Sequence, residues 1–485
     1  MTTPVLIHDL LLQSAAAAPD RTALRHRGQS VAYAELADLV ERAASGLLRL
    51  GLGRLERVGI YLPKRIETVA SFFGTSRAGG VFVPINPLLK AEQVVYILQN
   101  CSVQVLVTSR DRWTELRSAL GEASPIRHVV LVDSEDTNGV EVSWTALVTR
   151  STAGARDHRP VIDIDMASIL YTSGSTGKPK GVVLSHRNML CGAVSVSTYL
   201  ENQADDRLLA VLPFSFDYGL SQLTTAFRVG ACVVLLDYLF PRDVVRTCEA
   251  EKITGLAGVP PVWSQVADLA WPVTITDHLR YITNSGGRMP RATLDKLRQL
   301  LPRTKPFLMY GLTEAFRGTY LPPEEIDRRP DSMGKAIPNA EILVVRPDGT
   351  TCGPDEPGEL VQRGSLVALG YWNDPVKTAE RFKPVPGQRA ELPITELAVW
   401  SGDTVRKDEE GYLYFVGRRD EMIKTSGYRV SPTEVEEVVY ASGLVGDAVA
   451  FGASHPTLGE AIVVVVSPPS GRAAADAASD ELLSY

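Results

Sequence analysis

The loop from Tyr171 to Gly181 carries four hydroxyl side chains besides the tyrosine, two lysines and three glycines in eleven residues. Glycines let backbone N–H groups turn toward one point, hydroxyl groups add donors, and lysines add compact positive charge. This chemistry suits a polyphosphate ligand. Only two residues separate Gly174 from Gly177, whereas the strand-to-helix P-loop needs four, so the loop is of a different kind. A solvated Ser/Gly linker is the weaker alternative, because apolar, strand-like runs flank the loop.

As a whole, this loop resembles the phosphate-loop signature of the AMP-forming adenylating enzymes. That superfamily includes acyl-CoA ligases, luciferases and the adenylation domains of peptide synthetases. The resemblance implies that the loop binds the phosphates of ATP, with Thr176 and Lys178 as catalytic residues. The loop residues implied in nucleotide binding are Thr172, Ser173, Gly174, Ser175, Thr176, Gly177 and Lys178.

The segment from Met309 to Ala315 resembles the second signature of the same superfamily. There the tyrosine stacks on adenine and the threonine contacts phosphate, which implies these roles for Tyr310 and Thr313. The glutamate of the signature helps to hold magnesium, which makes Glu314 the implied metal ligand and a catalytic residue. This is chemically reasonable, because a hard cation takes carboxylate oxygens beside phosphate oxygens. Gly311 belongs to the same nucleotide-binding turn.

Two further segments resemble adenosine-binding motifs of the superfamily. Residues 284–288 look like the glycine turn along the adenosine, and residues 400–403 look like the motif whose aspartate accepts both ribose hydroxyls. A carboxylate can accept two O–H bonds at once. The nucleotide-binding residues implied here are Gly286, Gly287, Arg288, Asp403 and the ribose-contacting Arg418.

The resemblance implies a two-step reaction that uses ATP and magnesium. A carboxylic acid attacks the α-phosphate of ATP to give acyl-AMP and pyrophosphate, and a thiol then displaces AMP. The thiol is coenzyme A or the phosphopantetheine of a carrier protein. Residues 424–429 resemble the loop that swings toward the active site for the second step, with Lys424 as a catalytic residue. Gly427 leaves room there for the pantetheine arm.

The pocket for the acid is implied to be lined by Phe216, Asp217, Ser285, Met309 and Arg317. Phe216 takes the position of a gating aromatic residue that is often histidine in acyl-CoA ligases. Asp217 falls where amino-acid-activating domains keep an aspartate for the substrate ammonium group. A buried carboxylate needs a partner, and Arg317 could supply it from within the protein. Both interpretations of Asp217 remain open from sequence.

The amino-acid sequences of residues 212–223, 310–323 and 417–437 are most similar to those of acyl-CoA ligases associated with exosortase-A gene clusters. We therefore expect a ligase that joins an unspecified carboxylic acid to coenzyme A. The first alternative is a stand-alone amino-acid adenylating enzyme that loads a carrier protein. The second alternative is a nucleotide-binding relic without turnover.

The pattern of helices and strands expected around these residues predicts an α/β fold. Apolar periodicity predicts helices over Ile7–Ala18, Tyr33–Leu50 and Ile66–Gly79, with strands over 58–62 and 81–84. Such alternation favours layers of helices on a largely parallel sheet. Ser185 and Ser431 are expected as N-caps of helices that run to about 200 and 440, and strands are expected near 445–451 and 461–466.

Two domains are expected. Residues 1–419 form a large AMP-binding domain of layered α/β subdomains, with a β-rich subdomain from about 340 to 419 where short strands alternate with Asp/Gly/Pro turns. Asp420 is the implied hinge, and residues 420–485 form a small, mobile α+β C-terminal domain. The superfamily ends this domain with a lysine-bearing loop that serves adenylation. No lysine follows Lys424 here, so the small domain is expected to be incomplete and full adenylation activity is doubtful.

Length and composition fit a large globular enzyme, and the resemblance implies a small carboxylic acid as its substrate. The net charge of −7 and the absence of a Lys/Arg-rich tract argue against a nucleic-acid partner. Five scattered cysteines without a C-x-x-C pair indicate buried thiols in a reducing compartment. Neither a signal peptide nor a stretch long enough to span a membrane is evident, so we expect a cytoplasmic location.

Overall fold

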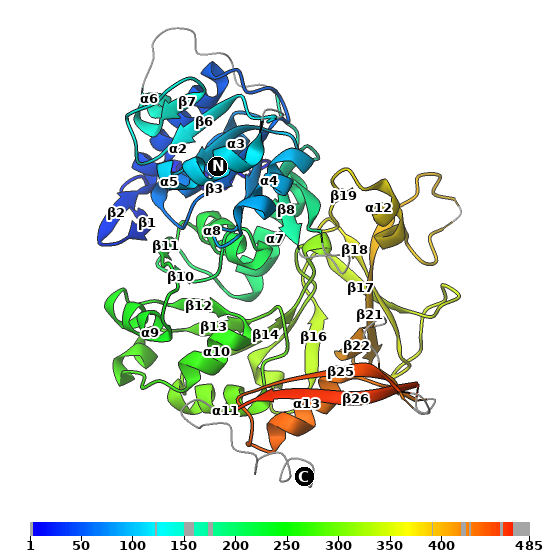
Figure 1. The fold of residues 1–485 in the computed structure, drawn as a ribbon. Coiled ribbons are helices and arrows are strands. Elements are labelled where there is room, and N and C mark those ends of the chain that lie inside the picture. Colours follow the sequence, from blue (N-terminus) through cyan, green and yellow to red (C-terminus); the bar gives the residue numbers. More distant parts are fainter. Residues whose placement is uncertain are drawn as a thin grey trace.

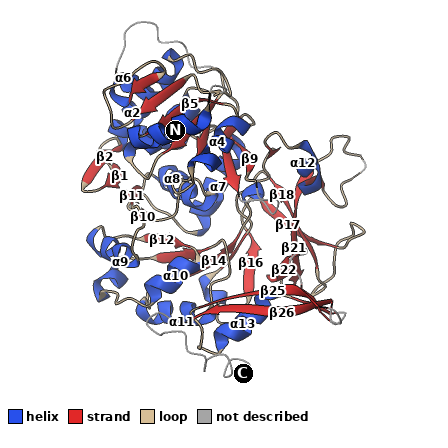
Figure 2. Ribbon diagram, in the orientation of Figure 1, coloured by secondary structure: helices blue, strands red, loops and turns tan. Residues whose placement is uncertain are grey.

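The computed structural model describes residues 3–121, 124–149, 160–172, 178–389, 391–418, 423–425, 428–455 and 459–468. It shows the predicted α/β architecture, with two large sheets, the helices packed against them and a small third sheet near the C-terminus (Figures 1 and 2).

Within the described residues, one sheet has eight strands in the order β19-β9-β8-β4-β3-β5-β6-β7. The neighbours from β8 to β7 along this order run parallel, which confirms the predicted parallel sheet. Only β9, which pairs with β8 and β19, runs antiparallel to its neighbours. The bounds are β3 Arg57–Tyr61, β4 Val81–Pro84, β5 Val103–Thr108, β6 His128–Leu131, β7 Glu141–Ser143, β8 Met166–Thr172, β9 Lys180–Ser185 and β19 Gly370–Tyr371.

The second large sheet follows the order β17-β18-β21-β22-β16-β15-β14-β13-β12-β10-β11-β1-β2, with β20 paired to β21. The pairs from β14 to β1 are parallel, and those from β14 to β17 are antiparallel. The parallel part comprises β1 Thr22–His26, β10 Arg207–Ala210, β11 Cys232–Leu235, β12 Gly255–Gly258, β13 Tyr281–Asn284 and β14 Lys305–Tyr310. The antiparallel strands are β2 Gln29–Ala32, β15 Thr319–Leu321, β16 Ser332–Ala336, β17 Ala340–Val345, β18 Gly358–Gly364, β20 Phe382–Pro384, β21 Leu397–Lys407 and β22 Leu413–Arg418.

The predicted helices of the first third are confirmed as α1 Asp9–Ala17, α2 Tyr33–Arg49 and α3 Ile66–Arg77. The remaining helices are α4 Ala91–Asn100, α5 Arg110–Leu120, α6 Trp144–Val148, α7 His186–Tyr199, α8 Asp217–Val229, α9 Pro241–Ala250, α10 Pro260–Ala267, α11 Arg291–Leu300, α12 Pro375–Arg381 and α13 Pro432–Ala441. Short 3₁₀ helices are Val273–Asp277, Thr313–Ala315 and Pro323–Glu325. Over the described residues, no helix combines the length and apolar character that a membrane crossing requires.

The largest apolar core lies between the two large sheets. Helices α2, α3, α7 and α8 fill it with fully buried side chains such as Leu36, Val69, Met189 and Leu223. Burial of this kind contributes about 25 cal/mol per Å² of apolar surface removed from water. The core therefore fixes the relative position of the two sheets whose ends carry the predicted site residues.

The two expected helix caps differ in outcome. The hydroxyl of Ser185 accepts a hydrogen bond from the Asn188 N–H (3.2 Å), as predicted for the start of α7. Ser431 begins α13, but the predicted side-chain cap is wrong, because its buried hydroxyl has no hydrogen-bond partner among the described residues. The first turn is closed by its backbone instead, with the Val435 N–H donating to the Ser431 carbonyl oxygen (3.3 Å).

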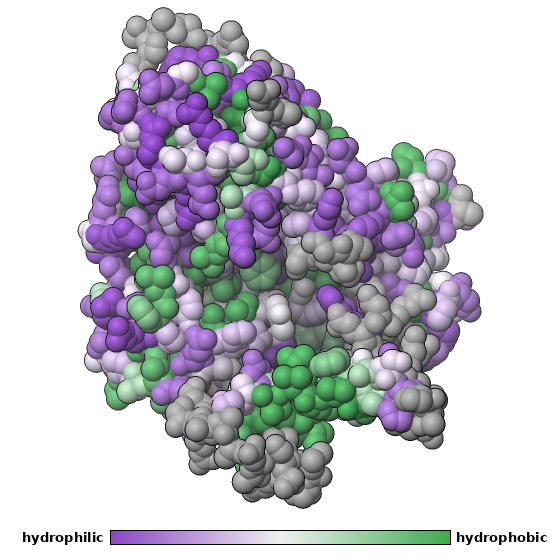
Figure 3. All heavy atoms as spheres, viewed as in Figure 1, coloured by the Kyte–Doolittle hydropathy of each residue, from purple (hydrophilic) through white to green (hydrophobic). Residues whose placement is uncertain are grey.

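The third sheet has the order β24-β23-β26-β25, with β23 Ile423–Thr425, β24 Tyr428–Val430, β25 Asp447–His455 and β26 Gly459–Ser467. The last two strands confirm the strands predicted near 445–451 and 461–466. Ala448 and Ala450 are buried on the face that α13 covers. Val449 and Phe451 project from the opposite face together with Val465, and Figure 3 shows apolar side chains gathered over these strands.

Candidate active site

The phosphate loop connects two antiparallel strands. Thr172, the last residue of β8, pairs with Lys180, the first residue of β9, so the loop is the tip of a hairpin and not a strand-to-helix turn. Of the predicted loop residues, Thr172 and Lys178 are described, whereas Ser173, Gly174, Ser175, Thr176 and Gly177 lie outside the described residues. The Lys178 ammonium lies over the Tyr96 ring (5.7 Å), and the Lys180 ammonium over the Tyr371 ring (5.4 Å).

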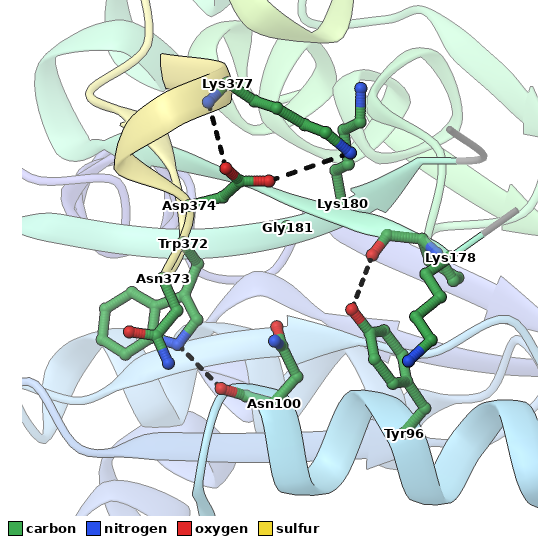
Figure 4. Close-up of a pocket in the computed structure, with 10 residues that line it drawn as sticks. Tyr96, Asn100, Lys178, Lys180, Gly181, Trp372, Asn373, Asp374 and Lys377 are labelled. Atoms are coloured by element: carbon green, nitrogen blue, oxygen red, sulfur yellow. Dashed lines mark hydrogen bonds and ion pairs between the residues drawn. The ribbon is translucent and has the colours of Figure 1, made fainter. Parts of the chain in front are cut away.

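A cavity of about 290 Å³ opens beside this hairpin (Figure 4). Lys178 and Tyr96 line one side, and Lys377 and Asp374 line the other. The Lys377 ammonium lies 4.0 Å from the Asp374 carboxylate, and the Tyr96 hydroxyl donates to the carbonyl oxygen of Pro179 (3.3 Å). The surface beside Lys178 and Lys180 is therefore a polar hollow with cationic groups at its rim.

Glu314, the predicted metal ligand, lies in the 3₁₀ turn that follows β14. Its carboxylate accepts a hydrogen bond from the Tyr371 hydroxyl (2.5 Å) and lies 3.9 Å from Nε of Arg381. The Glu314 side chain is only 13% exposed. Burial and the adjacent Glu314 charge raise the pKa of Tyr371 well above its usual range, so Tyr371 stays a proton donor at neutral pH. Sequence reasoning missed Tyr371 and Arg381, which no motif distinguishes.

The turn that carries Thr313 and Glu314 is fixed by a close contact with α7. Phe316, at the end of the turn, has a left-handed backbone conformation (φ +56°) and a fully buried ring. A Cβ on Gly192 would lie 2.2 Å from that ring, so only glycine fits at this place in α7. Gly311 packs in a similar way, because a Cβ there would lie 3.2 Å from the Arg317 Cα.

The predicted ribose carboxylate, Asp403, is almost fully buried on β21. It accepts a hydrogen bond from the Tyr310 hydroxyl, and its Oδ1 lies 3.3 Å from Nε of Arg418. The structure thus brings three predicted nucleotide residues together. Desolvation and the Asp403 charge raise the pKa of Tyr310, which keeps the phenol protonated and donating.

The predicted glycine turn follows β13 and is closed by Asn284, whose Nδ2 donates to the Gly287 carbonyl oxygen (2.8 Å). Gly286 takes a positive φ of 78° there. The Oδ1 atom of Asn284 is buried without a hydrogen-bond partner among the described residues, so it can accept a bond from a ligand N–H donor. Arg288 points elsewhere, because it pairs with Asp331 and with Glu437 of α13.

The predicted pocket wall contains a closed ion pair. Nη1 of Arg317 lies 2.9 Å from Oδ2 of Asp217, and its Nη2 donates to the Ser221 hydroxyl (2.7 Å). Thr313 approaches the other carboxylate oxygen of Asp217 (3.4 Å), which links the predicted pocket wall to the turn that carries Glu314. Burial raises the pKa of Asp217, and the positive charge of Arg317 opposes that rise.

The other predicted pocket residues surround this pair. A Cβ on Gly286 would lie 3.6 Å from the Phe216 ring, so the ring packs over the glycine turn beside the buried Ser285. Met309 is buried on β14, where its sulfur accepts a hydrogen bond from the Tyr199 hydroxyl (2.9 Å).

The predicted residues of the small domain are only partly visible. Lys424 lies in the middle of β23, opposite Arg429 of β24. Gly427 and the hinge residue Asp420 lie outside the described residues.

Residues 11–372 match the family model described as AMP-binding enzyme. The indoleacetate–CoA ligase of Aromatoleum aromaticum is 31% identical to this chain over 94% of its length and 86% of the ligase. The structure of the anthranilate CoA ligase AuaEII in complex with anthranoyl-AMP matches 99% of this chain and 90% of its own, with a TM-score of 0.87 and 24% identity, which shows a common fold. The structure of VinN with L-aspartate matches 85% of this chain and 98% of its own, with a TM-score of 0.72 and 28% identity.

Proposed function

This chain belongs to the AMP-binding enzyme family and is an AMP-forming acid–thiol ligase. We propose that it joins an apolar or aryl carboxylic acid, which carries no charge besides the reacting carboxylate, to coenzyme A. One observation carries the choice of acid. The two charges on the pocket wall, Asp217 and Arg317, are paired with each other at 2.9 Å, so they neutralise one another. Phe216 and Met309 provide apolar surface beside them. A relative that acts on indoleacetate supports an aryl acid as the first choice.

In the first step, a carboxylate oxygen of the acid attacks the α-phosphorus of ATP. The bond from that phosphorus to the bridging oxygen breaks, and pyrophosphate leaves with the electron pair. We assign Asp403 to the ribose hydroxyls and Tyr310 and Arg418 to the positioning of Asp403, on the strength of their contacts. Asn284 offers a buried acceptor for the adenine amino group. Positioning and fixed positive charge provide most of the rate enhancement in such a reaction, because negative charge develops on the phosphoryl oxygens in the transition state.

Lys178 supplies positive charge at the end of the phosphate loop, and Thr313 supplies a hydroxyl donor beside the α-phosphate. The remaining loop residues, including Thr176, keep their predicted phosphate-binding role as part of this proposal.

Glu314 is the residue that would hold magnesium. Over the described residues there is no cluster of three or more carboxylate, histidine or cysteine ligands. A single carboxylate fits a magnesium ion that arrives with the nucleotide, since Mg²⁺ takes one or two protein carboxylates and completes its shell with phosphate oxygens and water. When bound, the ion would neutralise charge on the phosphate oxygens.

In the second step, the thiol gives up its proton to solvent and its sulfur attacks the acyl carbon. The bond from that carbon to the phosphate oxygen breaks, and AMP leaves with the electron pair. We propose that residues 420–485 form the small domain that turns about Asp420 to bring Lys424 and Gly427 to the acyl-AMP. The pairing of β23 to β26 supports this, because among the described strands these four pair only with each other.

A pyrophosphate-release assay with a panel of fatty, aryl and amino acids tests the proposal, with the products identified by mass spectrometry. We expect ATP-dependent release with aryl or apolar acids and formation of the CoA thioester. A Glu314→Gln variant serves as the matched control and should lose release with every acid. Activity with amino acids alone would contradict the proposed acid class, and release without any thioester would contradict coenzyme A as the acceptor.

A second candidate, activation of an amino acid for transfer to a carrier protein, is favoured by one observation. Asp217 is a buried carboxylate on the pocket wall, where it can bind a substrate ammonium group if Arg317 turns away. A relative whose structure contains L-aspartate supports this candidate. Pyrophosphate release by the wild type with amino acids, and not with fatty or aryl acids, would establish it.

We propose the cytoplasm as the site of action. The five cysteines are all free in the structure, and four of them are buried, which suits a reducing compartment.

A further inference from the structure

Arg381 is the last residue of α12, the short helix beside β19 (Figure 1). We propose that Arg381 is a phosphate-binding residue of the adenylation site, where its guanidinium contacts the α-phosphate of the nucleotide. This inference rests on the proposed function, because it assumes that Glu314 holds the metal ion and Asp403 holds the ribose.

The guanidinium of Arg381 lies between those two carboxylates. Its Nε is 3.9 Å from Oε1 of Glu314. Gly402 directly precedes Asp403 in the chain. Nη1 of Arg381 lies 3.0 Å from the position that a Cβ on Gly402 would take. The Arg381 side chain is 24% exposed, so it borders solvent from a largely buried position.

The glycine at 402 explains how an arginine reaches this place. Gly402 has a positive φ of 73°, and a side chain there would meet the guanidinium. The irregular part of β21 that carries Asp403 thus also leaves the space that Arg381 occupies.

The hydrogen-bonding state of Arg381 indicates a missing ligand. Its Nε is a buried donor without a hydrogen-bond partner among the described residues, and the separation from Glu314 is too long for a hydrogen bond. Buried N–H groups normally have partners, so an unpaired one indicates an absent acceptor. Arginine suits phosphate oxygens, because its planar fork donates two parallel N–H bonds.

The chemistry of the nucleotide identifies the acceptor. The α-phosphate is bonded to the ribose at one end and, at the other, to the phosphates that would bind the metal ion. It must therefore lie between the ribose carboxylate and the metal carboxylate, which is where the guanidinium lies. In the absence of nucleotide, Arg381 partly neutralises Glu314, and a phosphate group would take over this positive charge.

The competing explanation is that Arg381 only holds Glu314 in place. Nucleotide binding without metal separates the two roles. We would measure the dissociation constants of adenosine and AMP by calorimetry in EDTA for the wild type, Arg381→Lys and Arg381→Gln. The matched control is Arg406→Gln, which removes an arginine on β21 that pairs with Asp355 at the surface. Thermal unfolding would establish that each variant is folded.

We expect Arg381→Gln to weaken AMP binding about tenfold, which corresponds to a loss of about 1.4 kcal/mol of binding free energy. The dissociation constant of adenosine should change less than about twofold. Arg381→Lys should fall between the wild type and Arg381→Gln, because it keeps the charge but not the fork. The ³¹P resonance of bound AMP should also titrate at a higher pKa in Arg381→Gln than in the wild type, because a contacting cation favours the dianion.

Unchanged AMP affinity in Arg381→Gln, with an altered magnesium requirement of the full reaction, would overturn the inference and leave Arg381 as a partner of Glu314. If both variants weakened the binding of adenosine and of AMP equally, the inference would be overturned as well. If the wild type bound neither adenosine nor AMP, the nucleotide site itself would be wrong, which is a separate failure of the proposed function.

Discussion

Arg317 and Asp217 form an ion pair with 2.9 Å between Nη1 and Oδ2, and their side chains are only 2% and 5% exposed. Such a pair contributes little net stability, but removing one partner leaves a buried charge and typically costs 3–5 kcal/mol. We therefore expect Asp217→Asn to lower the free energy of unfolding by about 3 kcal/mol in urea titrations.

A double variant, Asp217→Leu with Arg317→Met, should regain most of that stability, because it removes both charges. The exposed pair Arg298–Asp327 is the control, and Asp327→Asn there should change little. Full stability of Asp217→Asn would show that Arg317 finds another partner and that the pair does not hold the pocket wall.

The buried His186, which contacts the N-terminal segment, should make the stability of the folded chain sensitive to acid. Its Nδ1 accepts the backbone N–H of Ile7 (3.2 Å), and burial lowers its pKa to about 4, against a smaller opposing effect of Asp165 and two other carboxylates. The unfolded chain takes up a proton near pH 6.5 and the folded chain only near pH 4. Stability is therefore complete above about pH 6.5 and falls as the pH decreases toward 4, by up to roughly 3 kcal/mol.

His186→Asn keeps an acceptor at the same position without a titrating ring and should flatten this pH dependence in urea unfolding from pH 7 to 4. His128→Asn is the control for the loss of a histidine elsewhere. An unchanged slope in His186→Asn would assign the acid sensitivity to other groups.

Lys64 leads us to expect the same direction of pH dependence at alkaline pH. Its ammonium donates to the carbonyl oxygens of Val211 and Leu236 (both 2.9 Å), beyond the ends of β10 and β11, and burial lowers its pKa to about 8. Between pH 8 and 10.5 the unfolded chain keeps this proton and the folded chain releases it, so stability rises with pH over that window by roughly 3 kcal/mol. Relative to Lys64→Met, the wild type should gain stability from pH 8 to 10.5, whereas Lys305→Met should run parallel to the wild type. A constant difference between the wild type and Lys64→Met would refute this prediction.

The phosphate loop should be required for chemistry and not for folding. Thr176→Ala combined with Lys178→Ala should lower acyl-AMP formation by about 10²-fold or more, the scale for loss of fixed positive and donor groups. The melting temperature should barely change, because Lys178 is exposed. Lys296→Ala, at an exposed position on α11, is the control for loss of a lysine. Full activity of the double variant would contradict the assignment of the loop.

Gly192→Ala should disturb the turn that carries Thr313 and Glu314. A Cβ at 192 would lie 2.2 Å from the Phe316 ring, so the ring must move, at a cost of about 1–3 kcal/mol. We expect a lower melting temperature together with a weaker magnesium dependence of pyrophosphate release. Gly353→Ala, where a Cβ meets only the end of a glutamate side chain at 3.7 Å, is the control. An unaffected Gly192→Ala variant would show that the ring can shift freely.

The sequence by itself determined the family, the parallel sheet of the first third and most helix positions. These follow from local patterns, namely contiguous loop residues and apolar periodicity, which depend on short stretches of chain. The resemblance to the family implied that Asp217 and Arg317 share a pocket wall, but it left the partner of Asp217 open.

Only the tertiary structure decided that the buried carboxylate pairs with Arg317, which is one hundred residues away in the chain. It also placed Tyr371 and Arg381 beside Glu314 and the Phe316 ring against Gly192. These contacts join β19, α12 and α7 to the signature turn, and no spacing in the sequence encodes them. The physical reason is that burial and charge pairing are set by which elements the core brings together, and that packing involves residues far apart in the chain.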